Sequence, residues 1–154
     1  MKTRAILTSF VLMLAGALTC YAADNFSGTW KLNESKSKIA AGAAKNSTVV
    51  YEAAGDQTKV TVDGTSADGK AIHSEWTGKW DGKDYPVTGG ENEDTRAYTK
   101  VNDHTLSFTS KKGGKVTNNG RIVVSADGKT RTVTTHSTDA SGKKMSSTAV
   151  YEKQ

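Results

Sequence analysis

The sequence is poor in the residues that define several protein classes. It has one cysteine and one proline in 154 residues, and only 35% of its residues are hydrophobic. A single cysteine cannot form an intramolecular disulfide or a cysteine-based zinc site. The scarcity of proline excludes a collagen-like repeat or a proline-rich linker, and the low apolar content excludes a bundle of transmembrane helices. The length fits one domain after removal of a targeting segment.

The N-terminus has the order of a secretory signal peptide. Lys2 and Arg4 precede an apolar stretch over Ala5–Leu18, and the small residues Ala22 and Ala23 follow. The stretch is shorter than the roughly 20 residues that cross a bilayer. We therefore predict a signal peptide over the first 23 residues, export to the periplasm or the medium, and a chain that does not span the membrane.

Lipid attachment at Cys20 is the alternative to simple secretion. Bacterial lipoproteins are cut just before a lipidated cysteine, but Thr19 stands where a small residue is expected. In both cases the folded domain occupies 24–154.

Loss of two positive charges with the signal peptide lowers the formal net charge from +5 to +3. The remaining lysines lie mostly in turns, without an arginine-rich stripe, so we expect no nucleic-acid partner.

The rest of the chain consists of turns and of short segments in which apolar and polar residues alternate. Pairs of residues that tolerate positive φ recur along the chain, at 68–69, 81–82, 89–90, 113–114 and 127–128. Between them, Val60 and Val62 alternate with polar residues, as do Leu106 and Phe108. This two-residue period is typical of β-strands with one buried and one solvent-exposed face.

About ten strands follow from this pattern. We place them near 28–33, 47–54, 57–64, 70–80, 84–88, 94–101, 104–111, 115–125, 129–138 and 144–153. Such a run of hairpins closes most easily into an antiparallel up-and-down barrel, because closure removes both sheet edges. We therefore predict an all-β barrel, with a two-layer β-sandwich as the alternative. Asn119-Gly120 inside a strand suggests either a bulge or a turn at that point.

Small residues on the inward faces suggest a cavity. Ser147 and Ala149, for example, share a face with Tyr151 on the last predicted strand. Small side chains facing a barrel axis leave space for a ligand or water, or a gap that another strand fills. The residues expected to contact a ligand are Val60, Val62, Trp76, Trp80, Phe108 and Tyr151.

Both ends of the predicted barrel resemble the calycins, which include the lipocalins, the avidins and the fatty-acid-binding proteins. Phe26–Leu32 carries the Gly-x-Trp mark of their first strand, and Ala149–Lys153 is similar to the closing strand of fatty-acid-binding proteins. The Gly-Thr-Trp-Lys-Leu start and the Tyr85–Gly89 segment also resemble small secreted bacterial proteins. The resemblance implies a calycin-like barrel.

The resemblance also implies how one end of the barrel is closed. In calycins the Gly-x-Trp tryptophan packs against an arginine from a late strand, which stacks a cation on a large ring. Gly28 and Trp30 match the motif, and Arg121 is the first candidate for the arginine. The pattern does not say which face of that strand points inward, and Arg131 is the second candidate.

The resemblance further bears on the ligand. Fatty-acid-binding proteins hold a carboxylate with an Arg-x-Tyr pair on the last strand. Tyr151 matches the tyrosine, but Ala149 replaces the arginine and removes a charge-assisted bond. A neutral or differently anchored hydrophobic molecule is therefore the expected partner.

No catalytic or metal site is predicted. His73, His104 and His136 are interpreted as solvated strand residues. The carboxylates of Glu91, Glu93 and Asp94 are interpreted as solvated loop groups, with cation binding as the minor alternative. No known nucleophile motif or phosphate loop occurs. We predict a monomeric, non-enzymatic carrier without a cofactor. The alternative is a secreted inhibitor or interaction module that acts through its hairpin loops. An open barrel interior favours the carrier, and a filled interior favours the module that acts through its loops.

Overall fold

The computed structural model describes residues 24–138 and 141–154. The predicted signal peptide and its cleavage site lie outside these residues. Within them the chain forms β1 (Gly28–Leu32), a single 3-10 turn η1 (Glu34–Lys36), β2 (Lys45–Ala54), β3 (Gln57–Thr65), β4 (Ala71–Gly78), β5 (Tyr85–Thr88), β6 (Thr95–Asn102), β7 (Thr105–Lys112), β8 (Lys115–Val124), β9 (Thr130–Thr138) and β10 (Lys144–Lys153). These elements follow the predicted segments closely.

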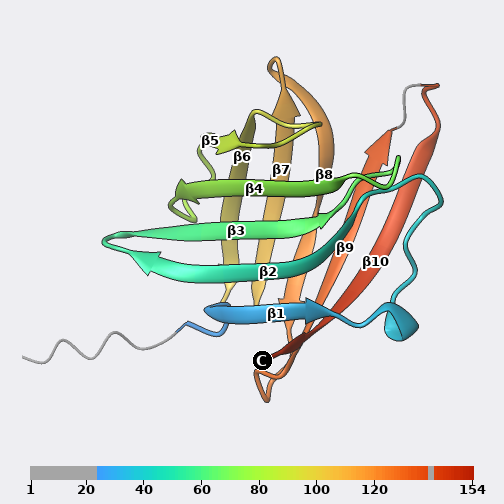
Figure 1. Ribbon diagram of the computed structural model, residues 1–154. Helices are drawn as coiled ribbons and strands as arrows, with labels where there is room; N and C mark the ends of the chain where they lie inside the picture. The colour runs from blue at the N-terminus through green and yellow to red at the C-terminus, as the bar shows by residue number, and fades with distance from the viewer. Residues whose placement is uncertain (1–23, 139–140) are drawn as a thin grey trace, which may run out of the picture.

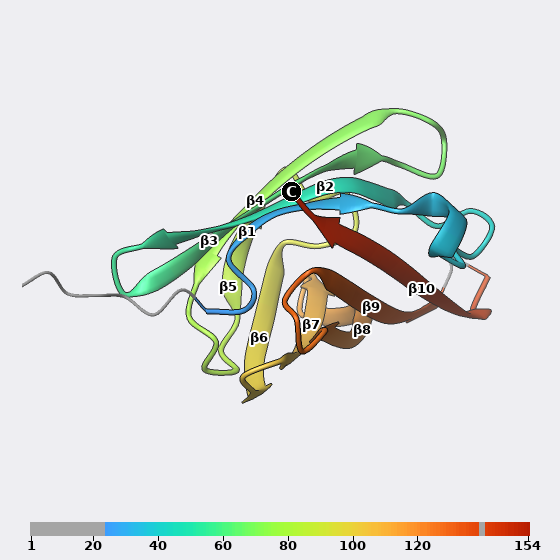
Figure 2. The same cartoon turned by 90° about the horizontal axis from the view of Figure 1, so that it is seen from below.

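The ten strands form a closed antiparallel barrel. Each strand pairs with its neighbours in sequence, and β1 closes the ring by pairing with β10. Strands β1–β4 form one side and β6–β9 the other, and the strands of the two sides cross steeply (Figures 1 and 2). The prediction of an up-and-down barrel is confirmed, and the sandwich alternative is wrong, because hydrogen bonding continues around the whole ring.

The alternation of side chains also follows the prediction. On β4, Trp76 and Gly78 are buried, whereas His73 and Thr77 between the inward positions are exposed. The predicted bulge is displaced: Gly120 pairs regularly with Phe108, and the register shifts instead around Thr117. Gly120 is a glycine because a Cβ there would lie 2.0 Å from the Thr134 carbonyl oxygen and 2.8 Å from the Phe108 ring.

Strand β5 is the least paired part of the barrel wall. It has two residue pairs with β4 and two with β6, whereas β9 and β10 share nine. The only proline of the chain, Pro86, lies in this strand and has no N–H to donate to a neighbour.

A cluster of large side chains closes one end of the barrel. Phe26 and Trp30 are fully buried, and the Trp30 indole Nε1 donates a 2.8 Å hydrogen bond to the Phe26 carbonyl. The Phe26 ring meets Trp80 edge to face at 5.2 Å. Gly28 begins β1 at a φ of 113°, and the Lys153 ammonium lies 5.2 Å from the Trp30 ring. Gly28 and Trp30 therefore lie at the closed end.

The arginine that stacks on Trp30 is Arg131, and the first candidate, Arg121, is wrong. Arg121 is exposed on the outer face of β8, because its neighbours Ile122 and Val124 take the inward positions. Arg131 is 2% exposed, and its guanidinium carbon lies 5.4 Å from the centre of the Trp30 ring. A buried cation over an aromatic face is favourable because the ring carries a negative quadrupole.

The contact at Gly120 leads to a first prediction. Replacing Gly120 with alanine pushes a methyl group into the β9 backbone and the Phe108 ring. We expect Gly120→Ala to lower the free energy of unfolding by about 1–3 kcal/mol, the usual cost of overpacking. Urea denaturation measures this change.

Asn119→Ala is the matched control for that experiment, since Asn119 is the preceding residue of the same strand and its side chain is exposed. We expect a change within about 0.5 kcal/mol there. Equal stability of the two variants would show that the Gly120 contact is not a constraint.

Candidate functional site: an open cavity inside the barrel

The barrel contains a cavity of about 630 Å³ at the end opposite the Trp30 cluster. Its rim comes from the connections that follow β1, β3 and β5, with residues 42–44, 66–68 and 89–93 among them. These connections all lie at the end away from the chain termini, because successive strands run in opposite directions. The barrel is therefore filled at one end and hollow at the other.

Three of the predicted ligand-contacting residues line this cavity. Val62 contributes from β3, Phe108 from β7 and Tyr151 from β10. The small residues Ser147 and Ala149 on β10 line it as well, and their size leaves the space that the sequence pattern suggested. The cavity thus joins side chains from opposite sides of the barrel.

The other three predicted residues do not line the cavity, and for them the prediction is corrected. Val60 and Trp76 are buried in the packed part of the core. Trp76 meets Tyr98 edge to face at 4.8 Å, and its Nε1 donates to the Arg96 carbonyl at 2.8 Å. Trp80 packs on Phe26 at the closed end. All three face inward as expected, but they lie at the filled end of the barrel.

The floor of the cavity is an arginine surrounded by aromatic rings. The Arg131 guanidinium carbon lies 5.2 Å from the Tyr51 ring centre and 4.4 Å from that of Tyr151, and all three residues line the cavity. Arg131 and Tyr151 are also directly paired in the β9–β10 ladder. Arg131 thus lies between the Trp30 cluster below it and the open space above it.

The two tyrosines remain protonated at neutral pH. Burial raises the pKa of Tyr51 far above its usual range, and the neighbouring Tyr98 adds to the increase. Burial also raises the pKa of Tyr151, although the charge of Arg131 opposes that shift. Both phenols are therefore neutral groups that can donate or accept a hydrogen bond.

A buried ion pair forms part of the cavity wall. Glu93 and Arg96 are joined by two contacts, one of them 3.0 Å between Arg96 Nε and Glu93 Oε2. Arg96 also donates to the Tyr98 hydroxyl at 2.9 Å and to the Ser110 hydroxyl at 3.3 Å. Glu93 is 9% exposed, so its interpretation as a solvating loop residue is wrong. No local pattern signals this pair, because the i, i+3 rule for charge pairs applies to helices, whereas Glu93 lies in the connection before β6.

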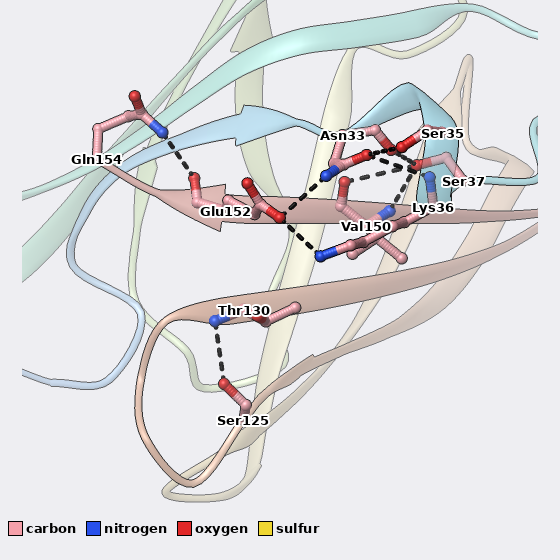
Figure 3. Close-up of polar contacts among 9 residues, drawn as sticks. All are labelled: Asn33, Ser35, Lys36, Ser37, Ser125, Thr130, Val150, Glu152 and Gln154. Carbon is pink, nitrogen blue, oxygen red and sulfur yellow. Dashed lines mark hydrogen bonds and ion pairs between the residues drawn. The ribbon is translucent and has the colours of Figure 1, made fainter.

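The connection between β1 and β2 is held against β10 by polar contacts (Figure 3). Glu152 accepts hydrogen bonds from Asn33 Nδ2 and Lys36 Nζ, both at 2.9 Å. The Ser37 hydroxyl donates to the Asn33 carbonyl and accepts from the Val150 N–H. These bonds fix the path of the segment whose later residues, 42–44, border the opening.

The arrangement offers both apolar and polar binding surface. Across 24–138 and 141–154, no group of three or more His, Cys, Asp or Glu side chains is placed to hold a metal ion. In the same part of the chain, no helix is long and apolar enough to cross a membrane. The cavity combines apolar side chains, hydroxyl groups, the Glu93–Arg96 ion pair and the buried cation of Arg131, and these groups can bury and orient a small molecule.

The Glu93–Arg96 pair generates a second prediction. Glu93→Gln removes the negative charge and leaves Arg96 buried with neutral partners only. We expect the free energy of unfolding to fall by about 3 kcal/mol, because an unpaired buried charge is costly. Thermal and urea denaturation measure the loss.

Glu91→Gln serves as the control, because Glu91 lies in the same connection and is exposed. Its effect should stay within about 0.5 kcal/mol. If Glu93→Gln were equally mild, the buried pair would not be a stabilising feature of the wall.

No protein-family model matches the chain, and no curated protein matches its sequence. Among solved structures it is similar to one described as EF1p2_mFAP2b bound to DFHBI, at 13% identity over 84% of this chain and 94% of that chain, with a TM-score of 0.47. It is also similar to a redesigned β-barrel, mFAP1, bound to DFHBI, at 18% identity over 84% and 95% of the two chains, with a TM-score of 0.44. Likenesses this distant carry no functional information.

Proposed function

We propose that the protein is an exported, non-enzymatic binding protein that holds a small, mainly hydrophobic molecule inside its barrel. The observation that carries this proposal is the cavity of about 630 Å³. Its volume lies within the range of roughly 300–1,000 Å³ that is typical of small-molecule sites. A barrel that acted only through its loops would gain nothing from such a space, because an unfilled interior lowers stability.

The distribution of side chains supports the same proposal. Phe108, Ile122 and Val133 offer apolar surface in the cavity, while Ser74 and Thr135 offer hydroxyl groups. Burying apolar ligand surface contributes about 25 cal/mol per Å², and a few polar groups fix the orientation of the ligand. The Trp30 cluster closes the far end, so the ligand enters from the rim.

Filling the cavity tests this function. Ala149→Phe places a ring in the space beside Tyr151, and we expect it to weaken binding of the neutral fluorescent probe 1-N-phenylnaphthylamine at least about tenfold. That loss equals the displacement of about two methylene groups of ligand surface. Fluorescence titration of both proteins gives the affinities.

Ala71→Phe is the matched control, because Ala71 is exposed on the outer face of β4 and its replacement should leave the affinity unchanged. Near-ultraviolet circular dichroism verifies that both variants are folded. The proposal fails if the unmodified protein shows no saturable binding, or if both variants bind as it does.

The signal-peptide pattern of the first 23 residues leads to a separate prediction, which concerns export. Expressed in a bacterial host, the protein should appear in the periplasm or the medium with an intact mass that lacks the first 22 or 23 residues. Mass spectrometry of the fractions decides the matter. A mass that retains Cys20 with an added lipid would instead support membrane anchoring, and an uncleaved cytoplasmic chain would contradict export.

A further inference from the structure

Arg131 is a buried cation without a counter-charge among the described residues. It is 2% exposed, and none of the ion pairs in that part of the chain includes it, whereas Arg96, the other arginine in the cavity wall, is neutralised by Glu93. A guanidinium cannot lose its proton in a protein. The cavity floor therefore carries a full positive charge that the described protein groups do not balance.

Two nitrogen atoms of the same guanidinium, which carry three N–H groups, are also unsatisfied. The Arg131 Nε and Nη1 atoms are buried and have no hydrogen-bond partner within residues 24–138 and 141–154. The surrounding rings interact with the cation through their π faces, which attract charge but do not accept in-plane N–H bonds as an oxygen does. Leaving buried donors unpaired costs free energy, so an acceptor supplied from outside the protein removes that cost.

The groups beside Arg131 suit an anion. Tyr51 and Tyr151 keep their protons, because burial raises the pKa of both, so the floor presents a cation and neutral hydroxyls. The acidic residues on the lining, Asp68 and Glu91, lie exposed in the rim connections, and Glu93 is already paired. Asp68 is itself paired with Lys70 at 2.6 Å, so the acidic residues on the described lining lie away from the floor and do not neutralise Arg131.

We propose that the ligand is an amphipathic anion whose single negative group, in the first instance a carboxylate, binds Arg131 at the cavity floor. Its apolar body lies toward the rim against Val62 and Phe108. This inference rests on the proposed binding function and adds the chemical class of the ligand. Hydrogen bonds between charged partners are about twice as strong as neutral ones, so the charge selects among molecules of equal size.

A matched pair of ligands tests the proposal with the unmodified protein. Decanoate and 1-decanol have the same chain length and differ in charge, and each competes at pH 7.5 with the neutral probe 1-N-phenylnaphthylamine. We expect decanoate to bind at least about tenfold more tightly, as a charge-assisted hydrogen bond implies. Equal or tighter binding of 1-decanol overturns the anion site while leaving the carrier function intact. If neither compound nor the probe binds, the carrier function fails as well.

Variants test whether Arg131 causes the preference for decanoate over 1-decanol. Arg131→Met keeps a long apolar side chain and removes the charge, and we expect it to reduce the preference for decanoate to less than about twofold. Arg121→Met is the control, because Arg121 is exposed on the outer face, and it should keep the full preference. A folded Arg131→Met protein that retains the preference contradicts the assignment.

Because Arg131 also stacks on Trp30, its replacement changes the stability of the fold as well as the affinity for the ligand. Tyr151→Phe removes one hydroxyl group beside the guanidinium and leaves the aromatic stack in place. We expect it to weaken decanoate binding about threefold to tenfold and to leave 1-decanol unchanged. If the affinities for both compounds change equally, Tyr151 contributes only apolar surface and the hydroxyl has no part in anion binding.

Discussion

The stacking of one buried guanidinium among aromatic rings is the interaction on which the rest of the structure depends. Arg131 joins Trp30 below it to Tyr51 and Tyr151 beside it. These four residues come from β1, β2, β9 and β10, the strands on both sides of the seam where the ring closes. A single cation thus ties the first strands of the chain to the last ones.

The same stack divides the interior into two parts with different roles. On one side, large rings fill the barrel, and burial of their surface stabilises the fold. On the other side, small residues such as Ala149 and Ser147 leave the interior open. Stability and binding are therefore assigned to opposite ends of one barrel, and the floor of the binding cavity is also the top of the structural plug.

Much of the fold could be predicted from the sequence, because strands and turns depend on neighbouring residues. The site could be predicted only in part. Arg121 and Arg131 each share a strand face with the valine two residues further on, so local pattern does not reveal which arginine faces inward. The alternation of residues places Trp76 and Trp80 on the inner face, where they lie, but their depth along the barrel axis depends on pairing with distant strands. The burial of Glu93 likewise depends on how its connection folds over the wall.

The sparse pairing of β5 has a consequence for kinetics. Few main-chain hydrogen bonds hold Tyr85–Thr88 in place, so local separation of this strand costs less free energy than separation of β9 from β10. Residues 89–93, which follow β5 directly, border the cavity. Local opening of the barrel wall is therefore more frequent at this segment, beside the cavity rim, than between β9 and β10, where Arg131 pairs with Tyr151.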